Sequence, residues 1–259
     1  MKVSVIIPAY NEEKRIGRTL EKYSLYFENL RKSNQLDYEI LVVINNTTDR
    51  TEEIVKKSAE KNKRINFLNL KPGGKGYAIR EGFRKALDDE NDLIGFVDAD
   101  MSTLPEDFYF LIRKIGRDDG IIASRYVKGS VVKPRPSIQR TAASRVFNVF
   151  IRGLLFMPYR DTQCGAKLFK TEALKKTISD ISMSQWAFDV DLLYCLRKRN
   201  YKIKEVPTRW SDREYSKINF MQAGPLMALA ILRLRLINSP FKSFIRIYNF
   251  MFNSLKNIG

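Results

Sequence analysis

The chain has 259 residues, 44% of them hydrophobic, which is enough to bury one large core or two small ones and excludes a disordered protein. It carries 46 Lys and Arg against 29 Asp and Glu, a formal net charge of +17, and no His. The absence of His excludes a histidine base and histidine metal ligands, so a metal would need oxygen ligands, which favours Mg²⁺ or Mn²⁺ over Zn²⁺.

The first half of the chain alternates between two patterns. Continuous apolar runs typical of strands buried on both faces occupy residues 3–8, 39–44, 65–70, 93–98 and 120–125. Helical patterns lie between them, at residues 11–32, 48–62, 75–89 and 105–117. Such alternation predicts an α/β fold with a doubly wound, mostly parallel sheet and helices on both faces.

The chain begins with "MKVSVIIPAY", a short apolar run that breaks at Pro8. This pattern indicates a first strand rather than a signal peptide and predicts a protein that stays on the cytoplasmic side of the cell membrane. No run of 18 apolar residues occurs, so no ordinary spanning helix is expected. Cys164 and Cys195 have neither metal-ligand spacing nor a disulfide pattern, which predicts buried, reduced thiols.

The second half has a looser pattern and most of the positive charge. A basic loop at 128–137 is followed by a predicted helix at 138–156, a strand at 164–169, a helix at 184–200 and a strand at 203–210. Residues 125–170 hold ten basic residues and one acid, and residues 215–259 hold six basic residues and no acid. This asymmetry indicates an anionic partner, such as a nucleic acid, a phosphorylated substrate or a membrane surface.

The last part of the chain differs in composition from the rest. Two basic, aromatic and amphipathic segments, 219–238 and 241–256, are separated by Pro240. We expect a second region, 218–259, of helices that lie in a membrane interface without crossing it. The alternative is that these helices pack on the protein's own core or on a second subunit in an oligomer.

Three polar stretches follow predicted strands: Tyr10–Glu12, Asn45–Thr47 and Asp98–Asp100. Ligands of doubly wound sheets bind beyond the carboxyl ends of the strands, where these stretches fall. Asp98 and Asp100 would repel each other in an extended strand, whereas a turn at Ala99 would let them converge on a cation. The plain alternative is an acidic loop, because Asp is common in turns.

Several quoted stretches together carry a resemblance to a known family. They are "VIIPAYNEEKRI", "VVINNTTDRT", "GGKGYAIREGF" and "DADMSTLPEDF", followed by "DTQCGAKLFK", "WAFDVDLLYCL" and "EVPTRWSDREYSKI". Residues 1–217 resemble the family 2 glycosyltransferases of GT-A (Rossmann-like) fold, and within them the polyprenyl-phosphate branch, the dolichyl-phosphate glucose and mannose synthases. The last stretch is two residues shorter between Arg213 and Lys217 than the mannose synthase form.

The resemblance implies an inverting enzyme that moves a hexose from a nucleotide sugar, UDP-glucose first, to a dolichyl or polyprenyl phosphate at the cytoplasmic face of a membrane. Ile44, Asn45 and Asn46 replace a carboxylate pair that usually contacts the base, so GDP-mannose stays open as the donor. A glycan acceptor is a further alternative. A nucleic-acid-binding protein suits the charge but leaves the paired acids without a role. A nucleotidyltransferase is disfavoured because its Gly- and Arg-rich first loop is missing.

The resemblance also implies roles for individual residues. Asp100 is the main ligand of Mg²⁺ or Mn²⁺, and Asp98 supports the metal or binds the donor ribose. Asp189 is the base or the acid that orients the substrate. The donor is contacted by Pro8, Tyr10, Glu12, Asn45, Lys75, Asp98, Ala99, Asp100, Arg125, Arg213 and Lys217, and the acceptor phosphate by Arg135, Arg140 and Arg145.

Overall fold

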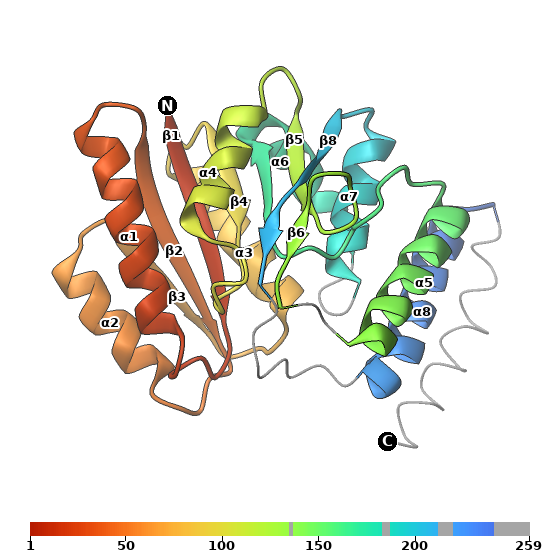
Figure 1. The fold of residues 1–259 in the computed structure, drawn as a ribbon, viewed down its shortest axis with the longest axis horizontal. Helices are drawn as coiled ribbons and strands as arrows, with labels where there is room; N and C mark the ends of the chain where they lie inside the picture. The colour runs from red at the N-terminus through yellow and green to blue at the C-terminus, as the bar shows by residue number, and fades with distance from the viewer. Residues whose placement is uncertain (135–136, 183–186, 212–219, 241–259) are drawn as a thin grey trace.

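A mixed sheet of seven strands, in the order β3-β2-β1-β4-β7-β5-β8, runs through the centre of the molecule (Figure 1). The structure is a computed structural model that describes residues 1–134, 137–182, 187–211 and 220–240. The strands are β1 (Lys2–Ala9), β2 (Asp37–Asn45), β3 (Ile65–Leu70), β4 (Leu93–Phe96), β5 (Gly120–Ser124), β7 (Lys167–Lys170) and β8 (Ile203–Pro207).

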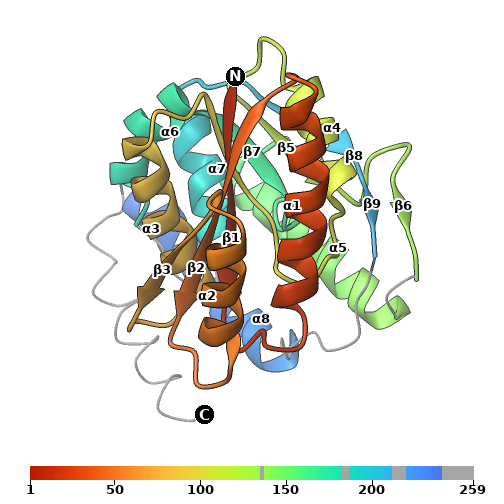
Figure 2. The same ribbon diagram turned by 90° about the vertical axis from the view of Figure 1, so that its left-hand side faces the viewer.

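Helices cover both faces of the sheet (Figure 2). One face packs against α1 (Ile16–Lys32), α2 (Thr51–Lys61) and α4 (Pro105–Lys114), and the other against α3 (Lys75–Asp88), α6 (Thr171–Thr177) and α7 (Phe188–Lys198). The predicted α/β class with a mostly parallel sheet is therefore confirmed.

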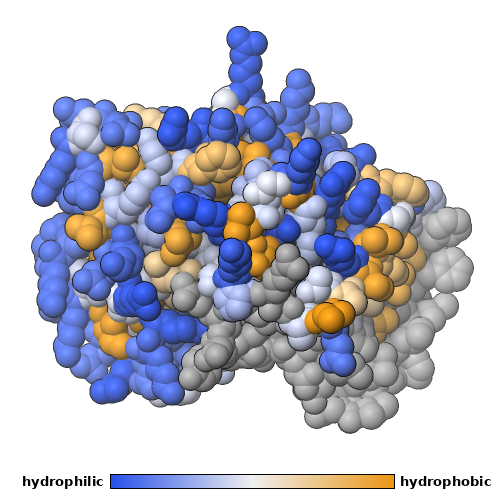
Figure 3. Space-filling view, in the orientation of Figure 1, coloured by the Kyte–Doolittle hydropathy of each residue, from blue (hydrophilic) through white to orange (hydrophobic). Residues whose placement is uncertain are grey.

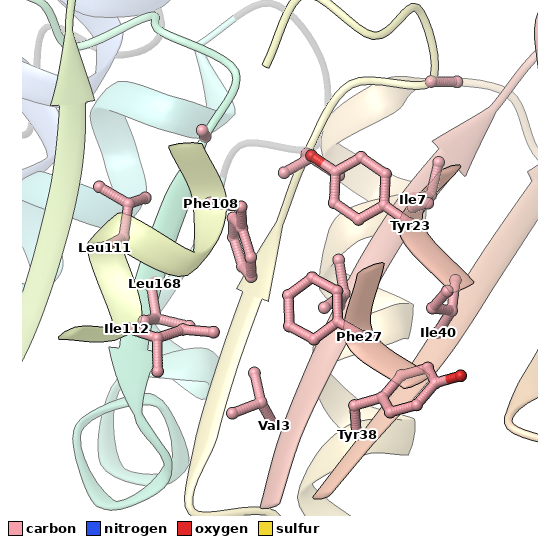
Figure 4. Packing of buried hydrophobic residues seen from close by; sticks show 14 of the residues in the cluster. Val3, Ile7, Tyr23, Phe27, Tyr38, Ile40, Phe108, Leu111, Ile112 and Leu168 are labelled. Atoms are coloured by element: carbon pink, nitrogen blue, oxygen red, sulfur yellow. The ribbon is translucent and has the colours of Figure 1, made fainter. Parts of the chain in front are cut away.

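Two hydrophobic clusters hold these layers together, because successive side chains of a strand point to opposite faces. In β1, Val5 and Ile7 belong to one cluster and Ile6 to the other, and all three are fully buried. Figure 4 shows the first cluster, in which Phe27 of α1 and Phe108 of α4 pack over the sheet with ring centroids 6.4 Å apart. The continuous apolar runs of the sequence thus reflect burial on both faces.

Three features of the fold were not predicted from the sequence. Strand β7 lies between β4 and β5 and is antiparallel to both. The predicted strand 203–210 divides, and its end forms β9 (Arg209–Trp210), which pairs with β6 (Val131–Val132) in a separate two-stranded sheet. Helix α6 and a 3₁₀ turn, Ile178–Asp180, follow β7 at once where the sequence indicated no helix.

Helices α5 (Ile138–Leu155) and α8 (Phe220–Ile237) pack side by side at one end of the molecule (Figure 1). Ile231 and Leu234 of α8 are buried in the same cluster as Leu155 of α5. The predicted segment 219–238 corresponds to α8, whereas 241–256 lies outside the described residues. Among the helices that are described, none combines the length and apolar composition needed to cross a bilayer.

Candidate active site

The carboxyl ends of β1, β2 and β4 meet at one edge of the sheet, because the three strands are parallel neighbours. The side-chain amide of Asn45, at the end of β2, links this edge together: in the orientation that satisfies both groups it donates to the Ala9 carbonyl at 3.1 Å and accepts from the Gly74 amide at 3.0 Å. Pro8 is buried in β1 opposite Val43. Asn45 and Pro8 are therefore structural residues of this edge of the sheet, and their side chains are buried inside the protein.

The paired acids lie just beyond β4. The strand ends at Phe96, and Ala99 and Asp100 form a turn that is followed by Met101 at a φ of 61°. The carbonyl of Ala99 accepts a hydrogen bond from Thr19 Oγ1 at 2.7 Å, and Asp100 Oδ1 accepts one from the Ser102 amide at 2.9 Å. The turn thus places Asp98 and Asp100 together beyond the end of β4, and their convergence on a shared cation stays a prediction.

Lys75, the first residue of α3, places its ammonium 2.5 Å from Asp98 Oδ1. Burial raises the pKa of Asp98, and the neighbouring charges of Asp100 and Asp189 add to that rise against the opposing effect of Lys75. Burial alone would lower the pKa of Lys75, but Asp98, Asp189 and Asp100 raise it overall. Lys75 therefore stays charged beside Asp98, Asp100 and Asp189. We call these three carboxylates the acidic cluster.

Asp189 joins the acidic cluster from the first turn of α7. Its carboxylate is held by Lys167 of β7, whose fully buried ammonium donates to Asp189 Oδ1 and to the Cys164 carbonyl, each at 2.6 Å. Asp191 faces elsewhere and is fully buried, and it accepts hydrogen bonds from the Ser182 amide at 2.7 Å and from the Cys195 thiol. The geometry thus separates the two acids of "FDVD" into one at the site and one inside the protein.

Two residues of the site were missed from the sequence, Lys167 and Gly165. A Cβ placed on Gly165 would lie 1.9 Å from Asp98 Oδ2, so only glycine allows the backbone to come this close to the carboxylate. The signal for Lys167 was a charged residue inside the short apolar strand "CGAKLF", which is unusual unless the charge has a buried partner.

Arg125 follows β5 and is engaged by a neighbour. Its guanidinium donates to both carboxylate oxygens of Asp161, at 2.7 and 2.9 Å, and lies over the rings of Tyr126 and Trp210. Burial would raise the pKa of Asp161, but the Arg125 charge and hydrogen bonds lower it overall. Arg125 thus anchors the loop that contains Asp161, a role that the sequence did not indicate.

The loops after β1 and β2 are joined to each other. Asn11 has a φ of 51° and accepts a hydrogen bond from the Thr48 amide at 2.8 Å, while Thr51 Oγ1 accepts one from the Glu12 amide at 2.7 Å. The carboxylate of Glu12 accepts two hydrogen bonds from the Arg15 guanidinium, at 2.6 and 2.7 Å. Tyr10 projects outward with 47% of its surface exposed. Tyr10 and Glu12 therefore border the sheet edge as predicted, with Glu12 already bound to Arg15.

The oxygen ligands at this edge suit a hard cation. Within the described ranges, no group of three or more Asp, Glu or Cys side chains is close enough to hold a metal ion. Asp98 and Asp100 offer two carboxylates, and the one hydrogen bond described for the Asp100 side chain leaves a second oxygen for a cation. This donor set fits Mg²⁺ or Mn²⁺ when other oxygens, such as those of a diphosphate, complete the shell.

The structure describes only some of the remaining basic residues that were predicted to bind the donor or the acceptor. Arg135, Arg213 and Lys217 lie outside the described residues, and Arg140 belongs to α5 but its side chain is not described. Arg145, also on α5, is exposed and lies over the Tyr126 ring, 5.5 Å from its centroid. The structure brings together Lys75, Asp98, Asp100 and Asp189, and it does not place Arg145 in contact with them.

Relatives of known name share most of the chain. A dolichyl-phosphate beta-glucosyltransferase of Trichomonas vaginalis is 33% identical over 246 residues, which cover 90% of this chain and 72% of the relative. A dolichyl-phosphate beta-glucosyltransferase of Dictyostelium discoideum is 33% identical over 244 residues, covering 90% and 73%. The Homo sapiens protein of the same name is 30% identical over 257 residues, covering 93% and 77%.

Solved structures confirm the fold. Glucosyl-3-phosphoglycerate synthase from Mycobacterium tuberculosis, in complex with Mn²⁺, uridine diphosphate and phosphoglyceric acid, has a TM-score of 0.67 at 16% identity and covers 92% of this chain and 78% of its own. This enzyme has the predicted GT-A fold, and identity at this level shows the fold alone. The family model described as Glycosyl transferase family 2 matches residues 4–178, more than half of the sequence. The chain is a glycosyltransferase and belongs to glycosyl transferase family 2.

Proposed function

We propose that this enzyme transfers a hexose, with inversion, from a nucleotide sugar to a dolichyl or polyprenyl phosphate, and that the donor is UDP-glucose. The observation that carries the proposal is the acidic cluster with Lys75 and Lys167 at the carboxyl edge of the sheet, in a chain related to dolichyl-phosphate glucosyltransferases. Paired carboxylates beside fixed cations suit a donor whose leaving group is a diphosphate.

The donor end of the reaction depends on charge neutralisation. Asp98 and Asp100 would hold Mg²⁺ or Mn²⁺, which supplies the positive charge that makes a nucleoside diphosphate a good leaving group. Lys75 fixes the position of Asp98, and Gly165 lets the backbone pack against the same carboxylate. The further donor contacts that we propose are Pro8, Tyr10, Glu12, Asn45, Ala99, Arg125, Arg213 and Lys217.

The acceptor end needs orientation more than a strong base. A phosphate monoester has a second pKa of about 6, so its attacking oxygen is already anionic near neutrality. Asp189, held by Lys167, would then orient the reacting groups, and Arg135, Arg140 and Arg145 would bind the acceptor phosphate. An enzyme with this acceptor works at a membrane, and we place it on the cytoplasmic face, with residues 218–259 as the contact to anionic lipid.

GDP-mannose is the second candidate donor. Asn45 stands where the family usually has a carboxylate, and its amide bridges Ala9 and Gly74 inside the protein. Its two hydrogen bonds stabilise the edge of the sheet, so the side chain does not show which base is bound. The sugar and the base of the donor must therefore be identified by experiment.

The decisive measurement is transfer from a panel of radiolabelled UDP- and GDP-sugars to a polyprenyl phosphate in detergent, with Mg²⁺, with Mn²⁺ and with excess chelator. We expect preference for UDP-glucose and loss of transfer in chelator. The Asp100→Asn enzyme should be inactive, whereas the matched control Asp88→Asn, an exposed acid at the end of α3, should behave as wild type. Preference for GDP-mannose would correct the donor, and transfer only to a soluble glycan would contradict the lipid acceptor.

A further inference from the structure

A cavity of about 290 Å³ lies beside α5, and none of the residues of the acidic cluster lines it. Helix α5 lines it with Arg145, Asn148, Val149 and Arg152, whose spacing of three, one and three residues places them on one helix face. Tyr126 and Arg160, from the two loops next to the helix, complete the lining.

The cavity is strongly basic. Arg145, Arg152 and Arg160 all have exposed side chains, and none of the three forms an ion pair with a residue of the described ranges. Of the nearby acids, Asp161 is bound by Arg125, and the Glu205 carboxylate accepts hydrogen bonds from the backbone amides of Arg160 and Asp161 at 2.8 to 3.0 Å. Three arginine side chains therefore line one cavity, with the Glu205 carboxylate as the acid next to Arg160.

The floor of the cavity is held in place by hydrogen bonds. Asn148, which is 2% exposed, accepts hydrogen bonds from the amide and the hydroxyl of Thr162 at 3.0 and 3.1 Å and donates to the Ser144 carbonyl at 2.9 Å. The Tyr126 hydroxyl donates to Ser144 Oγ at 2.8 Å, and the Arg145 guanidinium lies over the Tyr126 ring. The cavity is thus built on a hydrogen-bonded framework, and three arginines line it.

Apolar side chains stand beside these arginines. Val146, Val149 and Phe156 are 64 to 69% exposed, and Phe150 is 36% exposed. Figure 3 shows hydrophobic side chains gathered over α5 on the right of the molecule. A surface that offers cations and bare apolar groups together is complementary to the boundary between lipid headgroups and acyl chains.

We propose that this surface is a docking site for anionic phospholipid, in which the cavity takes the headgroup phosphate and the exposed side chains of Val146 and Val149 lie among the first carbons of the acyl chains. Guanidinium groups bind phosphate through paired, charge-assisted hydrogen bonds, which explains three arginines around one cavity. The inference deepens the proposed function and rests on it for the presence of a membrane. Arg145 is also one of the proposed acceptor contacts, so the test is made on Arg152 and Arg160, which are not among the proposed donor or acceptor contacts.

The test is flotation of the full chain with phosphatidylcholine vesicles that contain phosphatidylglycerol. We compare wild type with the double variant Arg152→Glu and Arg160→Glu, and with a matched control, Arg113→Glu and Arg117→Glu, which reverses two exposed arginines at the end of α4 and in the loop after it. The pocket variant should partition at least about tenfold more weakly, since each basic group near an anionic surface contributes measurably to binding. The control should float as wild type does, and both variants should keep the thermal unfolding midpoint of wild type.

Two results would overturn the proposal. The first is equal flotation of wild type and the pocket variant. The second is an equal loss in the pocket variant and the control, which would show that only total charge matters. Flotation needs neither donor nor metal, so failure of docking and failure of the proposed function are distinguishable.

Discussion

At Gly165 the backbone comes very near the acidic cluster, and the missing side chain is a requirement of the site. A Cβ at this position would lie 1.9 Å from Asp98 Oδ2, so an alanine must displace either the carboxylate or the strand that follows. Lys167, two residues further on, reaches Asp189 from the same segment. One short stretch of chain therefore determines the positions of two of the three carboxylates.

The Gly165→Ala enzyme is expected to transfer sugar about a hundredfold more slowly, because a shift of about 1 Å in a catalytic group has that order of effect. The matched control is Gly153→Ala on α5, where a Cβ meets nothing within 4 Å and alanine favours the helix. Initial rates on the preferred donor, with thermal unfolding as the check on folding, measure both. Wild-type rates in Gly165→Ala would show that Asp98 tolerates the displacement.

The Lys167→Met variant tests the buried ion pair with Asp189. Removing one partner of such a pair leaves a carboxylate without its cation, which lowers the free energy of unfolding by about 3 kcal/mol. Urea unfolding of Lys167→Met, Asp189→Asn and the double variant gives the coupling energy between the two groups. Additive losses in the double variant would mean that the pair contributes nothing of its own.

At the scale of elements, the loop of residues 156–166 connects α5 to β7 and is tied to the end of β5. The tie is the ion pair of Asp161 with Arg125, in which the Asp161 side chain is fully buried. The loop carries Gly165 at its far end, so its anchoring also supports the acidic cluster. The ion pair between Arg125 and Asp161, which are 36 positions apart in the sequence, thus supports the active site through a single loop.

This pair gives the stability of the protein a specific dependence on pH. The pKa of Asp161 is lowered by Arg125 from an ordinary value of 3.8, so the native state favours the carboxylate. Its contribution to stability is complete above that value and is lost as the pH falls through the lower native pKa. Asp161→Asn should therefore cost about 3 kcal/mol at neutral pH, and less as the pH drops below about 4. Urea unfolding across this range checks the sign, and a constant difference between variant and wild type would contradict it.

At the scale of the whole molecule, α8 packs both on α5 and on the main core. Ile231 and Leu234 are buried in the cluster that includes Leu155 of α5 and Phe188 of α7. The boundary at residue 217 stays a prediction, and α8 contributes core residues from beyond it. Deleting residues 219–259 would accordingly remove packing together with any membrane contact, whereas a truncation after residue 240 keeps α8.

We expect Ile231→Ala and Leu234→Ala each to lower the free energy of unfolding by about 2–5 kcal/mol, because each leaves a cavity in the core. Leu232→Ala, on the exposed side of α8 with 38% of its surface accessible, should cost about 1 kcal/mol or less. The chain that ends at residue 240 should keep the unfolding midpoint of the full protein. Small losses at Ile231 and Leu234 would indicate that α8 separates easily from the core.

Prediction from the sequence succeeded where the signal is local. Most strands, most helices, and the turn that carries Asp98 and Asp100 follow from apolar runs, helical periodicity and a Pro at the start of a helix. The resemblance selected Asp189, and the structure shows that Asp191, two residues further along the helix, faces a different direction. The roles proposed for these residues remain predictions for the transfer assays.

The sequence by itself determined the α/β class, the family and the candidate edge of the sheet, because periodicity and short motifs are properties of neighbouring residues. Only the tertiary structure decided that β7 enters the sheet antiparallel between β4 and β5, which brings Gly165 and Lys167 to the acidic cluster. It also decided that Arg125 is engaged by Asp161 and that α8 belongs to the core. Each of these facts depends on strand register or on packing between residues far apart in the chain, where burial and the pairing of charges select one arrangement among many that the local patterns allow.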